Sequence, residues 1–197
     1  MGYFTNAGLF LLNVIFGLYI FAVLLRFMLQ LVRADFYNPI AQFLVAVTNP
    51  PLKPLRRVIP GMYGIDFASV VLLLLLELVF QTLLATLLNQ PVTVATLLVK
   101  GIFDVLHSTL SIYLFGILIM VLLSWINPYP NPLSQLLGRL TEPLLRPARQ
   151  TIPPFSGIDL SPMVVMIGIA LAQMALPYLE RGTLDLLRGA ARPGALG

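Results

Sequence analysis

The sequence predicts an all-α membrane protein with four transmembrane helices in two parallel tandem repeats, each with short amphipathic interfacial helices between its two spans. Two observations lead to this prediction. The first is composition: the 197 residues are 58% hydrophobic and 10% charged, with a mean hydropathy of +0.92, whereas soluble domains contain roughly 25% charged residues. The second is an internal duplication that extends over both halves of the chain.

Four apolar stretches are long enough to cross a bilayer, which takes about 20 helical residues. They cover residues 9–32, 67–88, 110–125 and 163–179, and the third can extend back to residue 101. The first twelve residues contain no lysine or arginine, unlike the basic start of a cleaved signal peptide. We therefore expect the first stretch to remain in the protein as a transmembrane helix.

Two proline-rich segments, one inside each half, match each other without a gap at an offset of 93 residues. The matched pairs include Asn38 and Asn131, Thr48 and Thr141, Pro50 and Pro143, Arg56 and Arg149, and Asp66 and Asp159. Because each copy contains two spans, both copies enter the membrane in the same direction. The duplication predicts a first repeat over residues 1–94, a second over 95–181, and a polar tail over 182–197.

The distribution of basic residues predicts the orientation. Basic side chains gather in the two proline-rich segments, at Arg33, Lys53, Arg56, Arg57, Arg139, Arg146 and Arg149, while the middle loop has only Lys100. The positive-inside rule therefore places both basic segments at the cytoplasmic face. Arg181, Arg188 and Arg192 near the C-terminus argue weakly for the opposite orientation.

Apolar residues in both proline-rich segments recur at helical spacing, which predicts an amphipathic helix at the membrane interface. The stripes are Ile40, Phe43, Leu44 and Val47 in the first copy, and Leu133, Leu136, Leu137 and Leu140 in the second. Asn38 and Asn131 suit the N-cap, each followed by a proline at the first helical position. The Thr-x-Pro sequences at Thr48 and Thr141 are expected to end these helices.

Five basic residues of the segments are candidates for binding anionic lipid headgroups or a protein partner: Lys53, Arg56, Arg57, Arg146 and Arg149. The alternative is a topological anchor that only obeys the positive-inside rule. Nucleic acid is a poor candidate ligand, because the net charge is only +4 and no basic run exceeds two residues.

Charged side chains inside spans are costly unless paired, so Arg26 and Glu77 are a candidate intramembrane pair. The pair would line a polar path or an oligomer contact, or would be purely structural. Asp66 and Asp159 precede the second and fourth spans and suit helix caps, with cation or partner binding as the alternative. Asp104 and His107 share a helix face, where a proton relay is possible but simple hydration is the more common role.

Enzyme signatures are absent from the sequence. There is no H-E-x-x-H, G-x-S-x-G, phosphate-binding loop or G-x-G-x-x-G motif. One histidine and no cysteine cannot supply bis-histidine haem ligation or a usual zinc site within one chain. We therefore expect no enzyme activity, no cofactor and no metal.

The proline-rich motifs closely resemble those of the YggT family of bacterial membrane proteins, also called YlmG-like. The resemblance rests on residues 33–43, 48–61 and 64–66, on their counterparts in the second copy, and on nearly the whole chain up to Glu180. It implies an inner-membrane location and a link to osmotic stress tolerance, cell division or cytochrome maturation, but no catalytic residue. The leading hypothesis is a scaffold or assembly factor with a membrane protein partner or a homo-oligomeric state; the alternative is a small oligomeric transporter or channel component in osmotic response.

Overall fold

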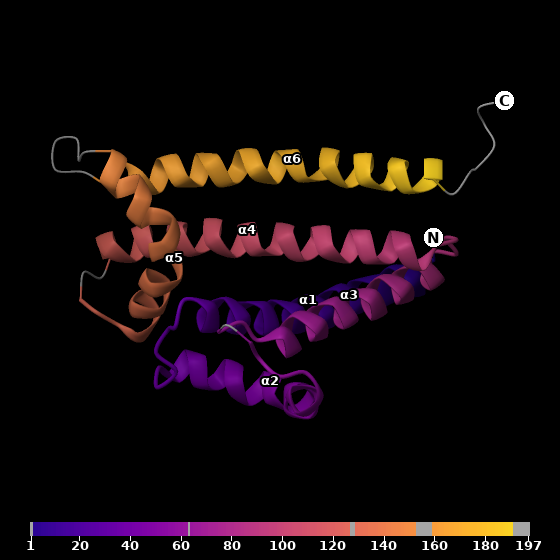
Figure 1. Cartoon of the computed structure of the whole chain (residues 1–197), viewed down its shortest axis with the longest axis horizontal. Helices are drawn as coiled ribbons and strands as arrows, with labels where there is room; N and C mark the ends of the chain where they lie inside the picture. The colour runs from indigo at the N-terminus through magenta and orange to yellow at the C-terminus, as the bar shows by residue number, and fades with distance from the viewer. Residues whose placement is uncertain (1, 63, 127–128, 153–158, 191–197) are drawn as a thin grey trace.

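The computed structural model of the chain describes residues 2–62, 64–126, 129–152 and 159–190. These residues form six α-helices joined by short loops (Figure 1). The helices are α1 (Tyr3–Leu31), α2 (Pro39–Val58), α3 (Phe67–Leu87), α4 (Val94–Ile126), α5 (Pro132–Thr151) and α6 (Ser161–Ala190). The all-α class and the alternation of long apolar and amphipathic helices are as the sequence predicts.

Four helices, α1, α3, α4 and α6, are long and apolar enough to cross a membrane. Three of them exceed the apolar stretches seen in the sequence, because no residue breaks the helix where the hydropathy falls. Lys100, expected in the middle loop, lies inside α4, whose 33 residues span about 50 Å against about 30 Å of hydrocarbon. Residues 182–190 of the expected polar tail continue α6.

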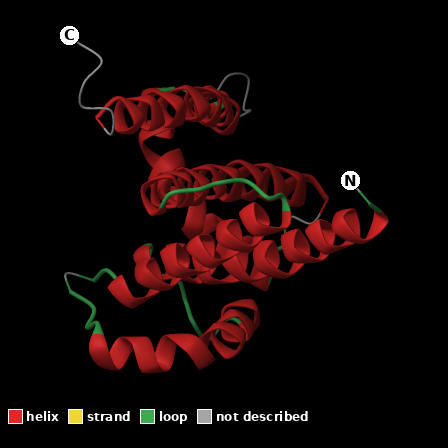
Figure 2. Cartoon of the chain, turned by 90° about the vertical axis from the view of Figure 1, so that its right-hand side faces the viewer, coloured by secondary structure: helices red, strands yellow, loops and turns green. Residues whose placement is uncertain are grey.

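The long helices run along the long axis of the molecule, and the amphipathic helices lie across or beside them (Figure 1). The start of α1 and the end of α6 lie at one end of the bundle, and α5 lies at the other. α2 flanks the α1–α3 pair on the side away from α6 (Figure 2). α1 packs on α3 and α4 packs on α6, while α3 and α4 join the two pairs. Each half of the chain is therefore a hairpin of two long helices with its own amphipathic helix.

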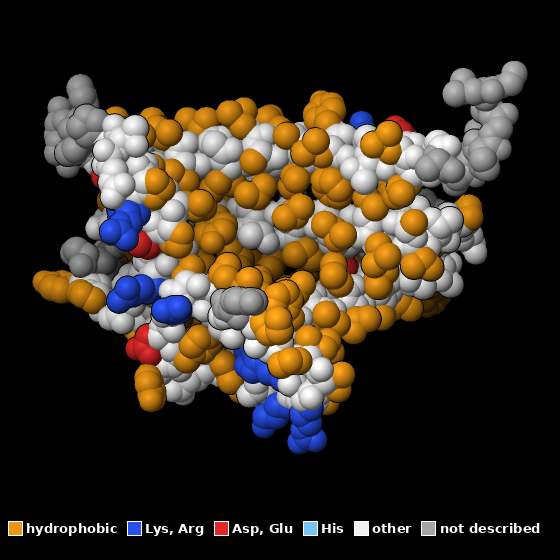
Figure 3. Space-filling model, viewed as in Figure 1, with side chains coloured by type: hydrophobic (Ala, Val, Ile, Leu, Met, Phe, Trp, Pro, Cys, Tyr) orange, Lys and Arg blue, Asp and Glu red, His pale blue; other side chains and the backbone are white. Residues whose placement is uncertain are grey.

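The interior consists of two apolar clusters. The larger one lies mainly among α1, α2 and α3, where it includes Val23 and Leu29, and it extends to Ile112 of α4 and Leu140 of α5. The smaller one joins α4, α5 and α6 through Ile117, Leu145 and Ile169. Many large hydrophobic side chains remain exposed on the outer surface of the long helices (Figure 3). An apolar exterior of this kind suits contact with lipid.

The amphipathic helices continue through their prolines, so the expected stop at Thr48 and Thr141 is wrong. α2 contains Pro50, Pro51 and Pro54, and α5 contains Pro143 and Pro147. Each proline removes one backbone hydrogen bond, but the buried side chains on both sides of it hold the helix against the bundle. The α1 hydroxyl of Tyr19 also reaches the carbonyl of Val47, at 3.5 Å, where Pro51 supplies no N–H.

Candidate functional site

The apolar stripes of α2 and α5 face the protein more than the lipid. Leu44 and Leu52 in α2, and Leu140 and Leu145 in α5, are at most 5% exposed. Phe43, by contrast, is 65% exposed, and Leu133 is partly exposed as well. The expected stripes are therefore divided: their inner edge anchors each helix on the long helices, and only the outer edge is left for the bilayer.

Asparagine side chains begin both amphipathic helices. Asn38 accepts a hydrogen bond from the Ile40 N–H, and Asn131 accepts one from the Ser134 N–H in a capping box. Asn38 also donates from Nδ2 to the Pro132 carbonyl, at 2.6 Å, across the two copies. The cap of α2 therefore fixes the start of α5 as well.

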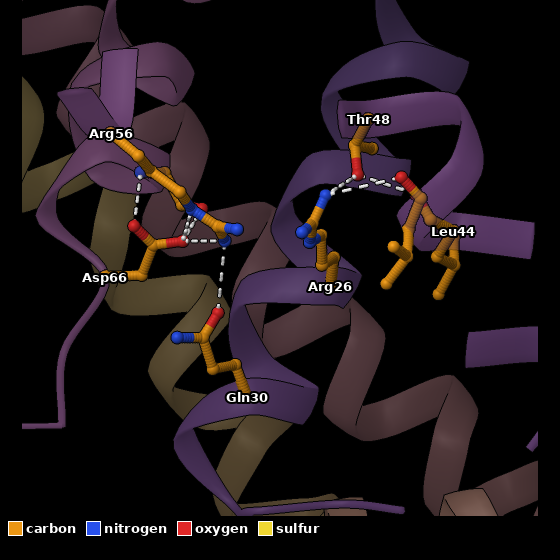
Figure 4. Close-up of polar contacts among 8 residues, drawn as sticks. Arg26, Gln30, Leu44, Thr48, Arg56 and Asp66 are labelled. Atoms are coloured by element: carbon orange, nitrogen blue, oxygen red, sulfur yellow. Dashed lines mark hydrogen bonds and ion pairs between the residues drawn. The ribbon is translucent and has the colours of Figure 1, made fainter. Parts of the chain in front are cut away.

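An arginine–aspartate pair connects each amphipathic helix to the following long helix. Arg56 donates to Asp66 Oδ2 from Nε, at 3.2 Å, and from Nη2 (Figure 4). Arg149 donates from Nε to Asp159 Oδ2 at 2.9 Å. The two pairs occupy matched positions of the duplication, and we call them the braces. Both arginines, candidates for headgroup binding, are thus engaged within the protein.

The aspartates of the braces also interact with the starts of α3 and α6. Asp66 accepts hydrogen bonds from the Ser69 N–H and hydroxyl, and Asp159 accepts one from the Ser161 N–H. Burial raises the pKa of both carboxyls, but the hydrogen bonds from arginine and serine outweigh burial, so both pKa values lie below the ordinary 3.8. The carboxylates are therefore ionised at neutral pH. Pro153, Gly157 and Ile158 of the second motif lie outside the described residues.

The braces differ in burial. The Asp66 side chain is 4% exposed and that of Asp159 is 43% exposed. Arg56 also reaches Gln30 of α1, at 3.5 Å, while Arg149 reaches Glu142 of its own helix, also at 3.5 Å. The first brace therefore joins three helices and the second joins two. Sequence reasoning missed both braces, although the ten-residue spacing of arginine and aspartate in both copies was a usable signal.

Arg26 does not pair with Glu77, so this expectation is wrong. Arg26 is 4% exposed and donates from Nη1 to the Thr48 hydroxyl at 2.6 Å (Figure 4). The Thr48 hydroxyl in turn donates to the Leu44 carbonyl at 2.6 Å. Arg26 points toward α2, whereas Glu77 packs against Gly101 of α4. The separation arises because the two side chains face different neighbouring helices.

Glu77 lines a cavity of about 600 Å³ with residues of α1, α4 and α5. Asp104 and His107 line the same cavity. Gln81 donates to Asp104 Oδ2 at 2.7 Å. In the described part of the chain, no group of three or more His, Cys, Asp or Glu residues is arranged to hold a metal ion.

Three of the five candidate basic residues, Lys53, Arg57 and Arg146, are exposed, and none of them has an ion pair within the described residues. Arg146 and the exposed Arg139 line a groove of about 640 Å³ between α5 and the segment before α2. Figure 3 shows the basic side chains gathered over the α2 and α5 side of the molecule. The structure therefore separates arginines that hold the fold from basic groups that are free to bind a ligand.

Four potential membrane-spanning helices and two matched amphipathic helices define the class, a multi-pass helical membrane protein with a repeated unit. The model of the CCB3/YggT family matches residues 5–87 and 99–179. The chain belongs to the CCB3/YggT family. The two matched segments follow the two halves of the fold.

The relatives that match the chain have names that assign no activity. An uncharacterised protein of Pseudomonas aeruginosa is 44% identical over 173 residues, covering 86% of this chain and 88% of the relative. The uncharacterised protein YggT of Escherichia coli K12 is 36% identical over 183 residues, covering 92% and 95%. An uncharacterised ycf19 protein of Guillardia theta is 43% identical over 61 residues, covering 29% of this chain and 66% of the relative. No solved structure matches the chain.

Proposed function

We propose that this protein is a non-enzymatic scaffold or assembly factor of the bacterial inner membrane. In this proposal, exposed basic residues of α2 and α5 bind anionic lipid headgroups at the cytoplasmic face and present the two helices to a membrane protein partner. The observation that supports it is the division of the arginines: Arg56 and Arg149 lie in braces, while Arg57 and Arg146 are exposed. Rigid helices with free basic groups suit a stationary binding surface.

The geometry of the exposed groups favours headgroups over a purely topological anchor. A positive-inside signal requires only charge near a span and no fixed helix. Here, each basic helix is capped at its start, packed along one side and braced to the next long helix. Arg139 and Arg146 line the same groove, together with the acidic residues Asp35 and Glu142, so a phosphate there would meet two guanidinium groups beside two carboxylates.

The transport alternative loses its main support. It required a polar path lined by Arg26 and Glu77, but Arg26 reaches Thr48 instead. Osmotic stress tolerance, cell division and cytochrome maturation are all compatible with a scaffold, and the partner would decide among them.

Lipid retention tests the proposal. The intact protein, extracted with phosphatidylglycerol and phosphatidylcholine, is analysed by native mass spectrometry. The Arg57→Gln/Arg146→Gln variant should retain less phosphatidylglycerol, by roughly fivefold for each arginine if each contributes about 1 kcal/mol. Phosphatidylcholine retention should not change.

The matched control is Arg181→Gln/Arg188→Gln, which removes two exposed arginines of α6. This control should retain phosphatidylglycerol at the wild-type level. Equal losses in both double variants would indicate a general effect of net charge and contradict a headgroup site on α2 and α5.

A further inference from the structure

The cavity lined by Glu77 is mainly apolar and opens on the outer surface of the long helices. Its walls come from α1, α3, α4 and α5, and Figure 3 shows the surface hollowed between α4 and the α1–α3 layer. The apolar wall residues include Ile20, Phe21, Phe80, Ile112, Phe115 and Ile119. A volume of about 600 Å³ is in the range of small-molecule sites.

Glu77 has an unused acceptor in this cavity. The residue is 4% exposed, and its Oε2 atom has no hydrogen-bond partner within the described structure. Gly101 makes room for it: a Cβ at this position would lie 3.2 Å from the Glu77 Cβ. A buried carboxylate oxygen without a partner is costly in a medium that offers no water. The site therefore favours a ligand that brings a donor.

The charges around the cavity are one-sided. Asp104 lines it beside Glu77, and His107 lies one turn further along α4. Within the described lining there is no lysine or arginine. Lys100 of α4 and Glu180 of α6 act on Asp104 electrostatically from outside the lining, while Arg26 is occupied by Thr48.

We propose that this cavity binds a cationic amphiphile, with a protonated amine at Glu77 and Asp104 and its apolar body along the aromatic and aliphatic walls. A primary ammonium has three N–H donors on a compact head, so that it can serve both carboxylates together. A bare divalent cation is a poorer match, because Ca²⁺ takes six to eight oxygen ligands and these walls are mostly carbon. The ammonium comes either from a free lipophilic amine or from a phosphatidylethanolamine headgroup.

Equilibrium binding of radiolabelled dodecylamine to the full-length protein in phosphatidylcholine nanodiscs tests this site. Wild type should bind the amine and should bind dodecanol, which has no charge, much more weakly. Glu77→Gln should weaken binding by about tenfold or more, as for loss of a charge-assisted hydrogen bond. Asp185→Asn, which neutralises an exposed carboxylate of α6, is the control and should bind as wild type does.

A second variant fills the cavity without changing its charge. Gly17 lines the cavity, and a Cβ there would meet nothing within 4 Å. Gly17→Leu should therefore fold and reduce amine binding, whereas Gly168→Leu, at an equally open position on α6 outside the lining, should leave it unchanged. Wild-type binding by both Glu77→Gln and Gly17→Leu, or equal binding of dodecanol and dodecylamine, would overturn the proposal.

Phosphatidylethanolamine in the nanodisc distinguishes the two sources of the ammonium group. If this lipid displaces dodecylamine, the natural ligand is the lipid headgroup. If dodecylamine binding is undiminished, the ligand is a free amine. In both cases dodecylamine binds in the cavity. The cavity contains none of the exposed basic residues of α2 and α5. Loss of phosphatidylglycerol binding and loss of amine binding are therefore separate outcomes.

Discussion

The buried guanidinium of Arg26 depends on the hydroxyl of Thr48. Its Nε atom has no partner within the described residues, and Nη1 donates to Thr48 Oγ1 at 2.6 Å. The matched threonine of the second copy, Thr141, donates to the Leu137 carbonyl and contacts the Met120 sulfur, and within the described residues no arginine donates to it. The threonine at this repeat position therefore accepts a hydrogen bond from a buried arginine in the first copy but not in the second.

Thr48→Val should destabilise the fold by about 1–3 kcal/mol, because it removes the short hydrogen bond of a buried charged donor and leaves that donor only the Val45 carbonyl at 3.5 Å. Thr141→Val, equally buried, should cost under about 1 kcal/mol, because it removes only a neutral hydrogen bond. Equilibrium unfolding in mixed micelles measures both. Adding Arg26→Met to Thr48→Val should recover much of the loss, and equal costs for the two threonine variants would contradict this account.

At the scale of elements, the braces hold each amphipathic helix to the next long helix. The first brace has a buried aspartate and a third contact, Gln30 of α1, while the second is open to solvent on both sides. Exposed ion pairs contribute little because water and salt screen them. α2 should therefore depend on its brace more than α5 does.

Arg56→Gln should cost about 1–2 kcal/mol of folding free energy, because Asp66 then loses its partner while buried. The cost is discounted for the partial exposure of Arg56. Arg149→Gln should cost about 0–1 kcal/mol. Hydrogen exchange localises the effect: protection should fall in α2 for the first variant and hardly change in α5 for the second. A larger loss of protection in α5 on Arg149→Gln than in α2 on Arg56→Gln would contradict the ranking.

Features that depend on neighbouring residues in the sequence were predictable, whereas features that depend on packing between helices were not. Hydropathy and helical spacing are local, and they predicted the four spans and the apolar stripes of α2 and α5. The path of α2 through Pro50 and Pro51 was not predictable, because packing of Leu44 and Leu52 against other helices decides it. The hydrogen bond of Arg26 to Thr48 and the position of Glu77 beside α4 were missed for the same reason. The two residues lie at similar expected depths in the membrane, which suggested a pair. The direction in which each side chain points depends on helix packing, which the sequence does not show.

For the whole molecule, both braces titrate at acidic pH in the same direction. The pKa values of Asp66 and Asp159 lie below 3.8 in the folded chain. Each pair therefore stabilises the fold fully above the unfolded pKa of about 3.8, and the contribution is lost as the pH falls through the lower folded value. Near neutral pH the contribution of these two groups to stability should be constant and should not vary with pH.

Thermal unfolding measured between about pH 6 and about pH 2 checks this expectation. Wild type should lose stability below about pH 4, and Arg56→Gln/Arg149→Gln should show a flatter decline, because its aspartates have less lowered pKa values. The difference between the two proteins should be constant above about pH 5. A difference that widens on acidification would have the wrong sign for these pairs.

The two halves are alike in backbone but not in charge. Arg26 and Glu77 align with Ile119 and Ala170 of the second copy, so that each buried charge occurs once per molecule. A symmetric dimer of single units would carry every such group twice, and each energetic cost would double with it. Covalent fusion breaks that symmetry: each half can acquire buried polar groups that the other half lacks. The duplicated chain is, in effect, a heterodimer encoded as one polypeptide.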